Sequence, residues 1–152
     1  MFSMTVLPKR WTGYLLPIVA LYWLAMFIGT HVPHISLPGT STLVSLDKLL
    51  HFCGYLGLSF LLSLWLVATA STRGEGEMQT LRTRGYLILL FIAVYASLDE
   101  WTQLLVGRSC ELRDWAADIL GAFTGMLIVA TWVAVRNDSE PIGNRQLEEG
   151  GS

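Results

Sequence analysis

Residues 97–118 read SLDEWTQLLVGRSCELRDWAAD, a charged stretch that lies between two strongly apolar runs. The run before it, Tyr86–Leu98, and the run after it, Trp115–Val135, are each typical of a membrane-spanning helix. The stretch therefore predicts a helical hairpin that turns at one membrane surface. Ionisable groups within hydrocarbon cost about 2.5 to 3.5 kcal/mol each on insertion scales, and they usually face a bundle interior or a pathway. We therefore expect a functional site here.

The composition indicates an integral membrane protein. Of the 152 residues, 53% are hydrophobic and 14% are charged, and the mean hydropathy is +0.50. A helix needs about 20 mostly apolar residues to cross a bilayer, and four runs qualify: residues 11–30, 49–70, 86–105 and 115–135. The sequence thus predicts an all-α polytopic membrane protein, a four-transmembrane-helix bundle over residues 1–136, with a disordered cytoplasmic tail over residues 137–152. The first run is too long and too aromatic for a signal peptide, so we expect it in the mature protein.

The distribution of basic residues predicts the orientation. One side of the membrane would hold seven of them, in the two tails and the second connection: Lys9, Arg10, Arg73, Arg82, Arg84, Arg136 and Arg145. The other side would hold Lys48, Arg108 and Arg113. Because basic residues are enriched on the cytoplasmic side, both termini are expected in the cytoplasm. The connections over residues 31–48 and 106–114 are then extracytoplasmic.

The start of the second span carries three polar residues that call for an explanation. Ser45 is expected as the N-cap and Asp47 in the first turn, where its charge meets the positive end of the helix dipole. Asp47 and His51 are four residues apart and share one helix face, with Lys48 adjacent. Capping explains Asp47 alone, so we interpret the set as part of a functional site.

The end of the third span places Asp99 and Glu100 where the helix dipole is negative. A carboxylate there needs a cation, a proton or a polar cavity. Gln103 lies within side-chain reach of either residue on a helix. The alternative to a functional site is a structural salt-bridge network with one of the basic residues nearby: Lys48, Arg108 or Arg113.

The fourth span begins with Asp114 as the expected N-cap, and Asp118 lies a full turn further in. Gly121 or Ala122, and Gly125, follow Asp118 on one face. In the second span, Gly54 and Gly57 are small residues that allow close approach of a neighbouring helix. We expect Asp118 to face the other polar residues.

Two further residue pairs were considered as sites. His31 and His34 are separated by Pro33, and solvated interface histidines are the favoured interpretation over metal ligation. Cys53 and Cys110 would both lie towards the extracytoplasmic side, where a disulfide can persist. Burial of Cys53 as a small hydrophobic residue is favoured over that bond.

Taken together, the polar residues near this face should converge into one cavity. Such a cavity could bind a phosphate through its cations, transfer protons between His51 and a carboxylate, or coordinate a divalent metal. The residues alone leave these three chemistries open.

Two motifs, DKLLHFCGY at residues 47–55 and SLDEWTQLLVGRSCELRDWAADILG at residues 97–121, resemble the VanZ-like family of small bacterial membrane proteins. That family's pattern is Asp-Lys-x-x-His, then Asp-Glu-x-x-Gln, then Arg and Asp before the last span. Asp118 is a departure, because family members often carry Asn there. The resemblance implies a cell-envelope role in the bacterial cytoplasmic (inner) membrane, with a link to resistance against the glycopeptide teicoplanin.

Two hypotheses of different classes follow. In the first, the protein is an enzyme at the outer leaflet that acts on an anionic, lipid-linked or glycopeptide-type substrate. Its catalytic residues would be His51, Asp99, Glu100 and Asp114, and its substrate-binding residues Asp47, Lys48, Gln103, Arg108 and Asp118. In the second, the same cluster serves binding, transport or structure without bond chemistry. Membrane lipids are expected partners in both, and nucleic acid in neither.

Overall fold

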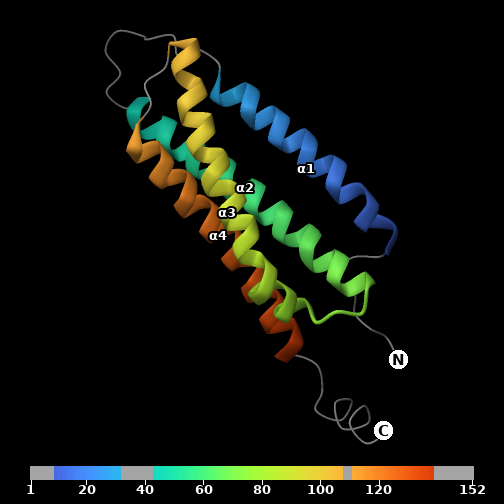
Figure 1. Ribbon diagram of the computed structural model, residues 1–152. Helices are drawn as coiled ribbons and strands as arrows, with labels where there is room; N and C mark the ends of the chain where they lie inside the picture. Colours follow the sequence, from blue (N-terminus) through green and yellow to red (C-terminus); the bar gives the residue numbers. More distant parts are fainter. Residues whose placement is uncertain (1–8, 32–42, 108–110, 139–152) are drawn as a thin grey trace, which may run out of the picture.

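The chain forms four long antiparallel helices that run up and down (Figure 1). The computed structural model describes residues 9–31, 43–107 and 111–138. Within these ranges the helices are α1 (Lys9–Thr30), α2 (Leu43–Thr72), α3 (Glu77–Gln103) and α4 (Leu112–Asp138), with a short 3-10 turn, η1 (Leu104–Val106), after α3. No strand occurs in the described ranges, so the predicted all-α four-helix architecture is confirmed.

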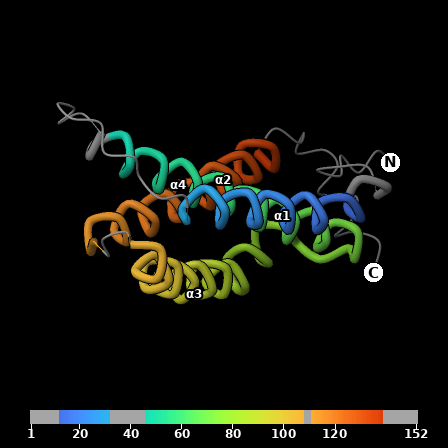
Figure 2. The backbone as a smooth tube through the Cα atoms, turned by 90° about the horizontal axis from the view of Figure 1, so that it is seen from above, coloured from blue at the N-terminus to red at the C-terminus, as the bar shows by residue number. Residues whose placement is uncertain are grey.

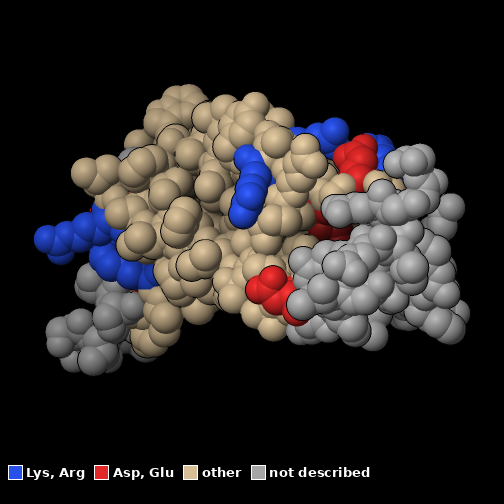
Figure 3. Space-filling view, turned by 90° about the horizontal axis from the view of Figure 1, so that it is seen from below, with Lys and Arg blue, Asp and Glu red and all other residues tan. Residues whose placement is uncertain are grey.

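Each of the four helices in the described ranges is long and apolar enough to cross a membrane. Large apolar side chains are exposed along all of them, for example Leu21 on α1, Leu50 on α2, Leu90 on α3 and Leu120 on α4. In the space-filling view, most of the visible face is uncharged, although a basic side chain lies near its middle (Figure 3). An apolar belt of this kind is stable in lipid rather than in water. The protein is therefore a multi-pass membrane protein.

The helix limits differ from the predicted ones most at the starts of α2 and α3. α2 begins at Leu43, so the expectation that Ser45 caps this helix and that Asp47 lies in its first turn is wrong. α3 begins at Glu77, so part of the connection expected before the third span at residue 86 is helical. The cause is burial on one face: Leu81 packs against Val67 of α2 and Val129 of α4, and this contact stabilises a turn whose composition alone looks like a loop.

Glycines bring α4 very close to α2. A Cβ atom added at Gly121 would overlap the backbone carbonyl of Phe52, and one at Gly125 would overlap that of Leu56. Such contact is open only to residues without a side chain, and it gives tight van der Waals packing between membrane helices. The contact at Gly121 and Gly125 places the α4 residue Asp118 directly opposite α2.

α1 lies at the edge of the bundle and packs mainly on α2, with a smaller contact to α3 (Figure 2). It meets the glycine face of α2 through side chains. The Tyr22 hydroxyl donates a hydrogen bond to the Gly54 carbonyl over 3.0 Å, and Met26 lies against the Cα of Gly54. The glycines of α2 therefore receive the side chains of α1 rather than its backbone.

The end of the bundle where α2 leads into α3 is held by ion pairs. Arg136 near the end of α4 pairs with Glu77 at the start of α3, and Arg84 pairs with Glu75 over 3.0 Å. Thus α3 and α4 are tied at this end by a charged contact. The charged residues predicted as site residues, where described, lie at the opposite end of the bundle.

Candidate functional site

His51 is the centre of the polar cluster, and three helices meet at its ring. The side chain is buried, with 3% of the residue exposed. Its Nδ1 donates a hydrogen bond to Oδ1 of Asp118 on α4 over 2.9 Å. Oε1 of Glu100 on α3 lies 3.8 Å from the same nitrogen. Both carboxylates are buried, so the expectation that Asp118 faces the other polar residues is met.

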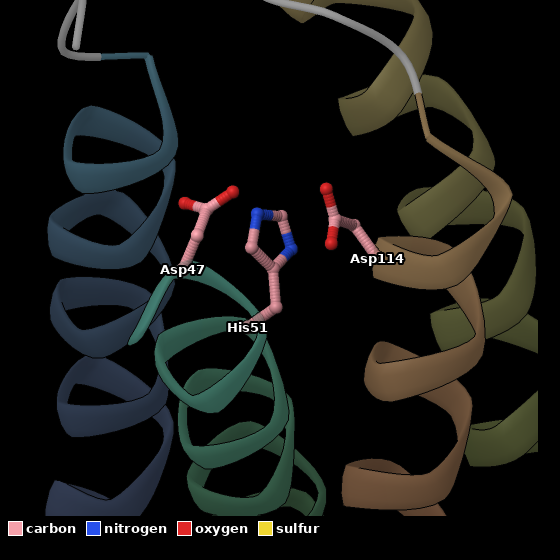
Figure 4. A group of neighbouring side chains, drawn as sticks. All are labelled: Asp47, His51 and Asp114. Carbon is pink, nitrogen blue, oxygen red and sulfur yellow. The ribbon is translucent and has the colours of Figure 1, made fainter. Parts of the chain in front are cut away.

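Two further carboxylates flank the ring on the side that Figure 4 shows. The ring of His51 lies between the carboxylates of Asp47, which comes from the same face of α2, and Asp114, which comes from α4 (Figure 4). The predicted sharing of one helix face by Asp47 and His51 is therefore correct. Asp114 is not the N-cap that the sequence indicated: α4 begins at Leu112, and Asp114 lies in its first turn.

The ammonium group of Lys48 pairs with two carboxylates. Its Nζ donates to Oδ1 of Asp114 over 2.7 Å and to Oε2 of Glu111 over 3.0 Å. Asp114 is buried, whereas Glu111 is partly exposed. Lys48 thus joins the start of α2 to the start of α4, as in the structural alternative raised from the sequence, although with different acidic partners from the Asp99 and Glu100 considered there.

Glu100 has a role that the sequence did not reveal. Its Oε2 accepts a hydrogen bond from the backbone N–H of Glu111 over 3.0 Å, just before α4 begins. The carboxylate is near the negative end of its own helix but at the positive end of the next one, where anions are stabilised. This contact accounts for one carboxylate oxygen of Glu100. The other oxygen, Oε1, has no hydrogen-bond partner among the residues described.

Asp99 belongs to a second group of contacts that ties α1 to α3. Its Oδ1 accepts from the Thr30 hydroxyl over 3.1 Å, and its Oδ2 accepts from Nε2 of Gln103 over 3.1 Å. The contact with Gln103 is one of the two predicted from helix spacing. His31 extends this group, because its Nε2 contacts the Thr102 hydroxyl over 3.0 Å. His31 is therefore a link between helices, and the expectation of a solvated histidine is wrong.

A pocket of about 360 Å³ reaches the cluster between α1 and α2. Most of its lining is apolar and comes from both helices: Tyr22, Ala25, Met26 and Gly29 of α1, and Leu50, Cys53 and Gly54 of α2. Its polar end is formed by Asp47 and His51, with Thr30 opposite. Gly29, Leu50 and Cys53 are exposed on the surface of the protein, so the pocket is accessible from the side that faces lipid.

Several predicted residues are placed elsewhere or are not described. Arg108, predicted to hold an anionic group, lies outside the described residues, as do His34 and Cys110. Arg113 is exposed. Cys53 is an exposed free thiol, so the expectation that it is buried as a small hydrophobic residue is wrong. The side chain is small enough for a tightly packed α2 but faces the pocket and not the core.

Two groups of side chains in the described ranges could hold a metal ion. One consists of Asp47, His51 and Asp114, and the other of His51, Glu100 and Asp118. In each group one potential ligand atom per residue lies within 4.8 Å of the other two. Imidazole with carboxylates suits divalent ions such as Zn²⁺ or Mn²⁺. The cluster therefore has the chemistry for proton transfer at His51 and for binding a divalent cation.

Comparison with known proteins agrees with these motifs. A family model described as VanZ/LLP1 matches residues 3–133, which include all four spans up to the last turns of α4. The chain belongs to the VanZ/LLP1 family. No curated protein and no solved structure gave a match. The membership covers both segments from which the VanZ-like resemblance was drawn, and it confirms that resemblance.

In this VanZ/LLP1 chain, sequence reasoning missed Thr30, His31 and Glu111 as members of the polar end. Glu111 could have been found, because it is a charged residue within the stretch that organises the fold. Thr30 carries no such signal, and His31 drew attention only for its spacing from His34. Their part in the cluster depends on how closely the end of α1 approaches α3.

Proposed function

We propose that this protein binds and acts on a lipid-linked or glycopeptide-type molecule of the cell envelope, at the extracytoplasmic surface of the bacterial cytoplasmic membrane. The observation that carries the proposal is the pocket between α1 and α2, which is apolar along its wall and polar where it reaches Asp47 and His51. Ligand sites commonly combine an apolar cavity with a few convergent polar groups. An apolar chain would occupy the wall, and the head group would reach His51.

The chemistry would be centred on His51. Asp118 orients the imidazole through the Nδ1 hydrogen bond, and Glu100 and Asp114 supply carboxylates beside it. A histidine held by a carboxylate is a suitable general base. Asp99 and Gln103 would support the site by fixing α1, because their contacts run to each other and to Thr30. The link to teicoplanin resistance belongs to this proposal and rests on the family resemblance.

A second candidate is a structural role for the whole cluster, and the contacts of Lys48 favour it. Lys48 is held by both Asp114 and Glu111, as expected if the charges serve to fix α2 against α4. This alternative explains Lys48 and Asp99. It gives no reason for a pocket that ends at His51, nor for the buried Oε1 of Glu100, which has no hydrogen-bond partner among the residues described.

The test fills the pocket without disturbing the bundle. A Cβ at Gly29 would meet no atom within 4 Å, so Gly29→Leu places a side chain into the open volume. Gly13→Leu is the matched control, because Gly13 is on the same helix, is equally unobstructed and does not line the pocket. Binding of a polyprenyl phosphate and of teicoplanin to the purified full chain would be measured separately, together with teicoplanin susceptibility of cells.

We expect Gly29→Leu to weaken binding of one of the two probes by about tenfold or more, which corresponds to about 1.4 kcal/mol, while Gly13→Leu binds like the wild type. The probe that is affected identifies the substrate class. Equal binding by both variants and the wild type, for both probes, would overturn the proposal and favour the structural role.

A further inference from the structure

Among the described residues, the buried end of the bundle gathers several carboxylates around one histidine and one lysine. Around His51 lie Asp47, Glu100, Asp114 and Asp118, of which the last three are buried. The nearest described lysine is Lys48, and two carboxylates already share it. Buried carboxylates are costly unless each is paired, protonated or bound to a metal. An anionic head group arriving at this end would be repelled unless a further cation were present.

One atom of the cluster is suited to bind such a cation. Because Nδ1 of His51 donates its proton to Asp118, Nε2 carries a lone pair when the ring is neutral, the form that binds a metal. That nitrogen is buried and has no hydrogen-bond partner among the residues that the structure describes. A histidine whose other nitrogen donates to a carboxylate is the common arrangement of metal-ligating histidines, since the carboxylate fixes the tautomer and the ring orientation.

The ring has carboxylates on both sides. Asp47 and Asp114 flank His51 (Figure 4), and one ligand atom of each residue lies within 4.8 Å of the other two. Ligands bound to one ion at about 2.1 Å lie about 3 to 4 Å apart. Small side-chain rotations are enough to bring the three atoms onto one ion. Lys48 holds only Oδ1 of Asp114, which leaves Oδ2 for the ion.

We propose that Asp47, His51 and Asp114 bind one divalent cation of the Zn²⁺ or Mn²⁺ type, and that Asp118 is a positioning residue that holds the His51 ring. This inference rests on the proposed function, because the role of the ion is to bind the head group of the substrate. Asp47 and His51 form the polar end of the pocket, so the ion lies where the head group arrives. Three protein ligands leave positions for an anionic oxygen of the substrate.

The rival position is the group of His51, Glu100 and Asp118, which shares the histidine. Oε1 of Glu100 and Oδ2 of Asp118 have no hydrogen-bond partner among the described residues, but both carboxylates lie at Nδ1 of His51. This group fits less well because Nδ1 donates its proton to Asp118 and offers no lone pair to an ion. That group is also absent from the pocket lining except for His51. The two positions make opposite predictions for substitutions at Asp47 and Glu100.

The test measures binding of Zn²⁺ alone to the purified full chain, freed of metal by a chelator and of any affinity tag, by calorimetry in detergent. We expect one ion per chain. Asp47→Asn, Asp114→Asn and His51→Gln should each weaken binding by about 100-fold or more, and Asp118→Leu by about 10- to 100-fold. Glu111→Gln is the matched control, because it removes a carboxylate that contacts Lys48 and belongs to neither group. Its affinity should stay within about threefold of the wild type.

A second variant keeps the test decisive if a ligand variant does not fold. The ammonium of Lys48 lies beside Asp114 and repels an ion bound to the same carboxylate, so Lys48→Gln should bind Zn²⁺ several-fold more tightly, and Zn²⁺ should raise its Tm more than that of the wild type. The proposal is overturned if Zn²⁺ does not bind, if binding survives His51→Gln, or if Glu100→Gln abolishes it while Asp47→Asn does not. Zn²⁺ binding without binding of either substrate probe would leave the metal site standing and remove the proposed function.

Discussion

Asp118 on α4 accepts a hydrogen bond from Nδ1 of His51 on α2 over 2.9 Å, and both residues are buried between two helices that touch through glycine. The relationship fixes which nitrogen of His51 carries the proton and which is left to react or bind. The hydrogen bond also depends on contact between the two helix backbones. The short side chain of Asp118 reaches the ring only because α4 lies so close to α2.

The first prediction concerns this hydrogen bond. Asp118→Asn keeps an oxygen that can accept from Nδ1 of His51, whereas Asp118→Leu leaves the buried Nδ1–H without an acceptor. An unsatisfied buried donor costs about 1 to 3 kcal/mol, so we expect Asp118→Leu to unfold at a clearly lower temperature than Asp118→Asn. Thermal unfolding in detergent measures the difference. Equal melting temperatures would mean that the bond does not hold the ring.

The second prediction tests whether Glu100 is needed for the protein's activity or for its stability. Glu100→Gln retains an oxygen to accept from the Glu111 N–H and removes only the charge. We expect cellular activity to be lost while Tm stays close to that of the wild type. A structural network would instead leave Tm strongly reduced, because loss of one partner of a buried pair costs about 3 to 5 kcal/mol. A fall in Tm that parallels the loss of activity would favour that network.

The third prediction concerns the contact of α4 with α2. Gly121→Ala adds a Cβ where the Phe52 carbonyl already lies, so the helices must separate. Overpacking of this kind costs about 1 to 3 kcal/mol. Gly13→Ala is the control, because the space at Gly13 is open. Thermal unfolding should show a marked loss for Gly121→Ala and little change for Gly13→Ala. If Gly121→Ala were as stable as the control, the close approach would be disproved.

The fourth prediction concerns orientation, which follows from the distribution of basic residues. In a variant with Cys53→Ala and Cys110→Ser, a cysteine at Val106, which is exposed just after α3, should react with a membrane-impermeant maleimide added outside the cell. A cysteine at Gly76, at the other end of the bundle, should react only after the membrane is opened. The reverse pattern would place the cluster on the cytoplasmic side.

The sequence by itself determined the four spans, the all-α class and most members of the polar cluster. These follow from local quantities: about 20 consecutive apolar residues demand a helix in lipid, and charges beside such runs, as at Asp99, Glu100 and Asp118, are too costly to be incidental. Spacing on one helix also predicted the pairing of Gln103 with Asp99 and the shared face of Asp47 and His51.

Only the tertiary structure decided which charges meet. Spacing relates residues on one helix but cannot reveal the rotation and approach of another, so the sequence could not assign Lys48 to Glu111 and Asp114, or Asp118 to His51. It misjudged Glu100 for the same reason, because the positive helix end that stabilises its carboxylate belongs to α4, not to its own helix. In the folded protein, where Gly121 and Gly125 bring α4 against α2, the polar residues form two separate groups, one around His51 and one around Asp99.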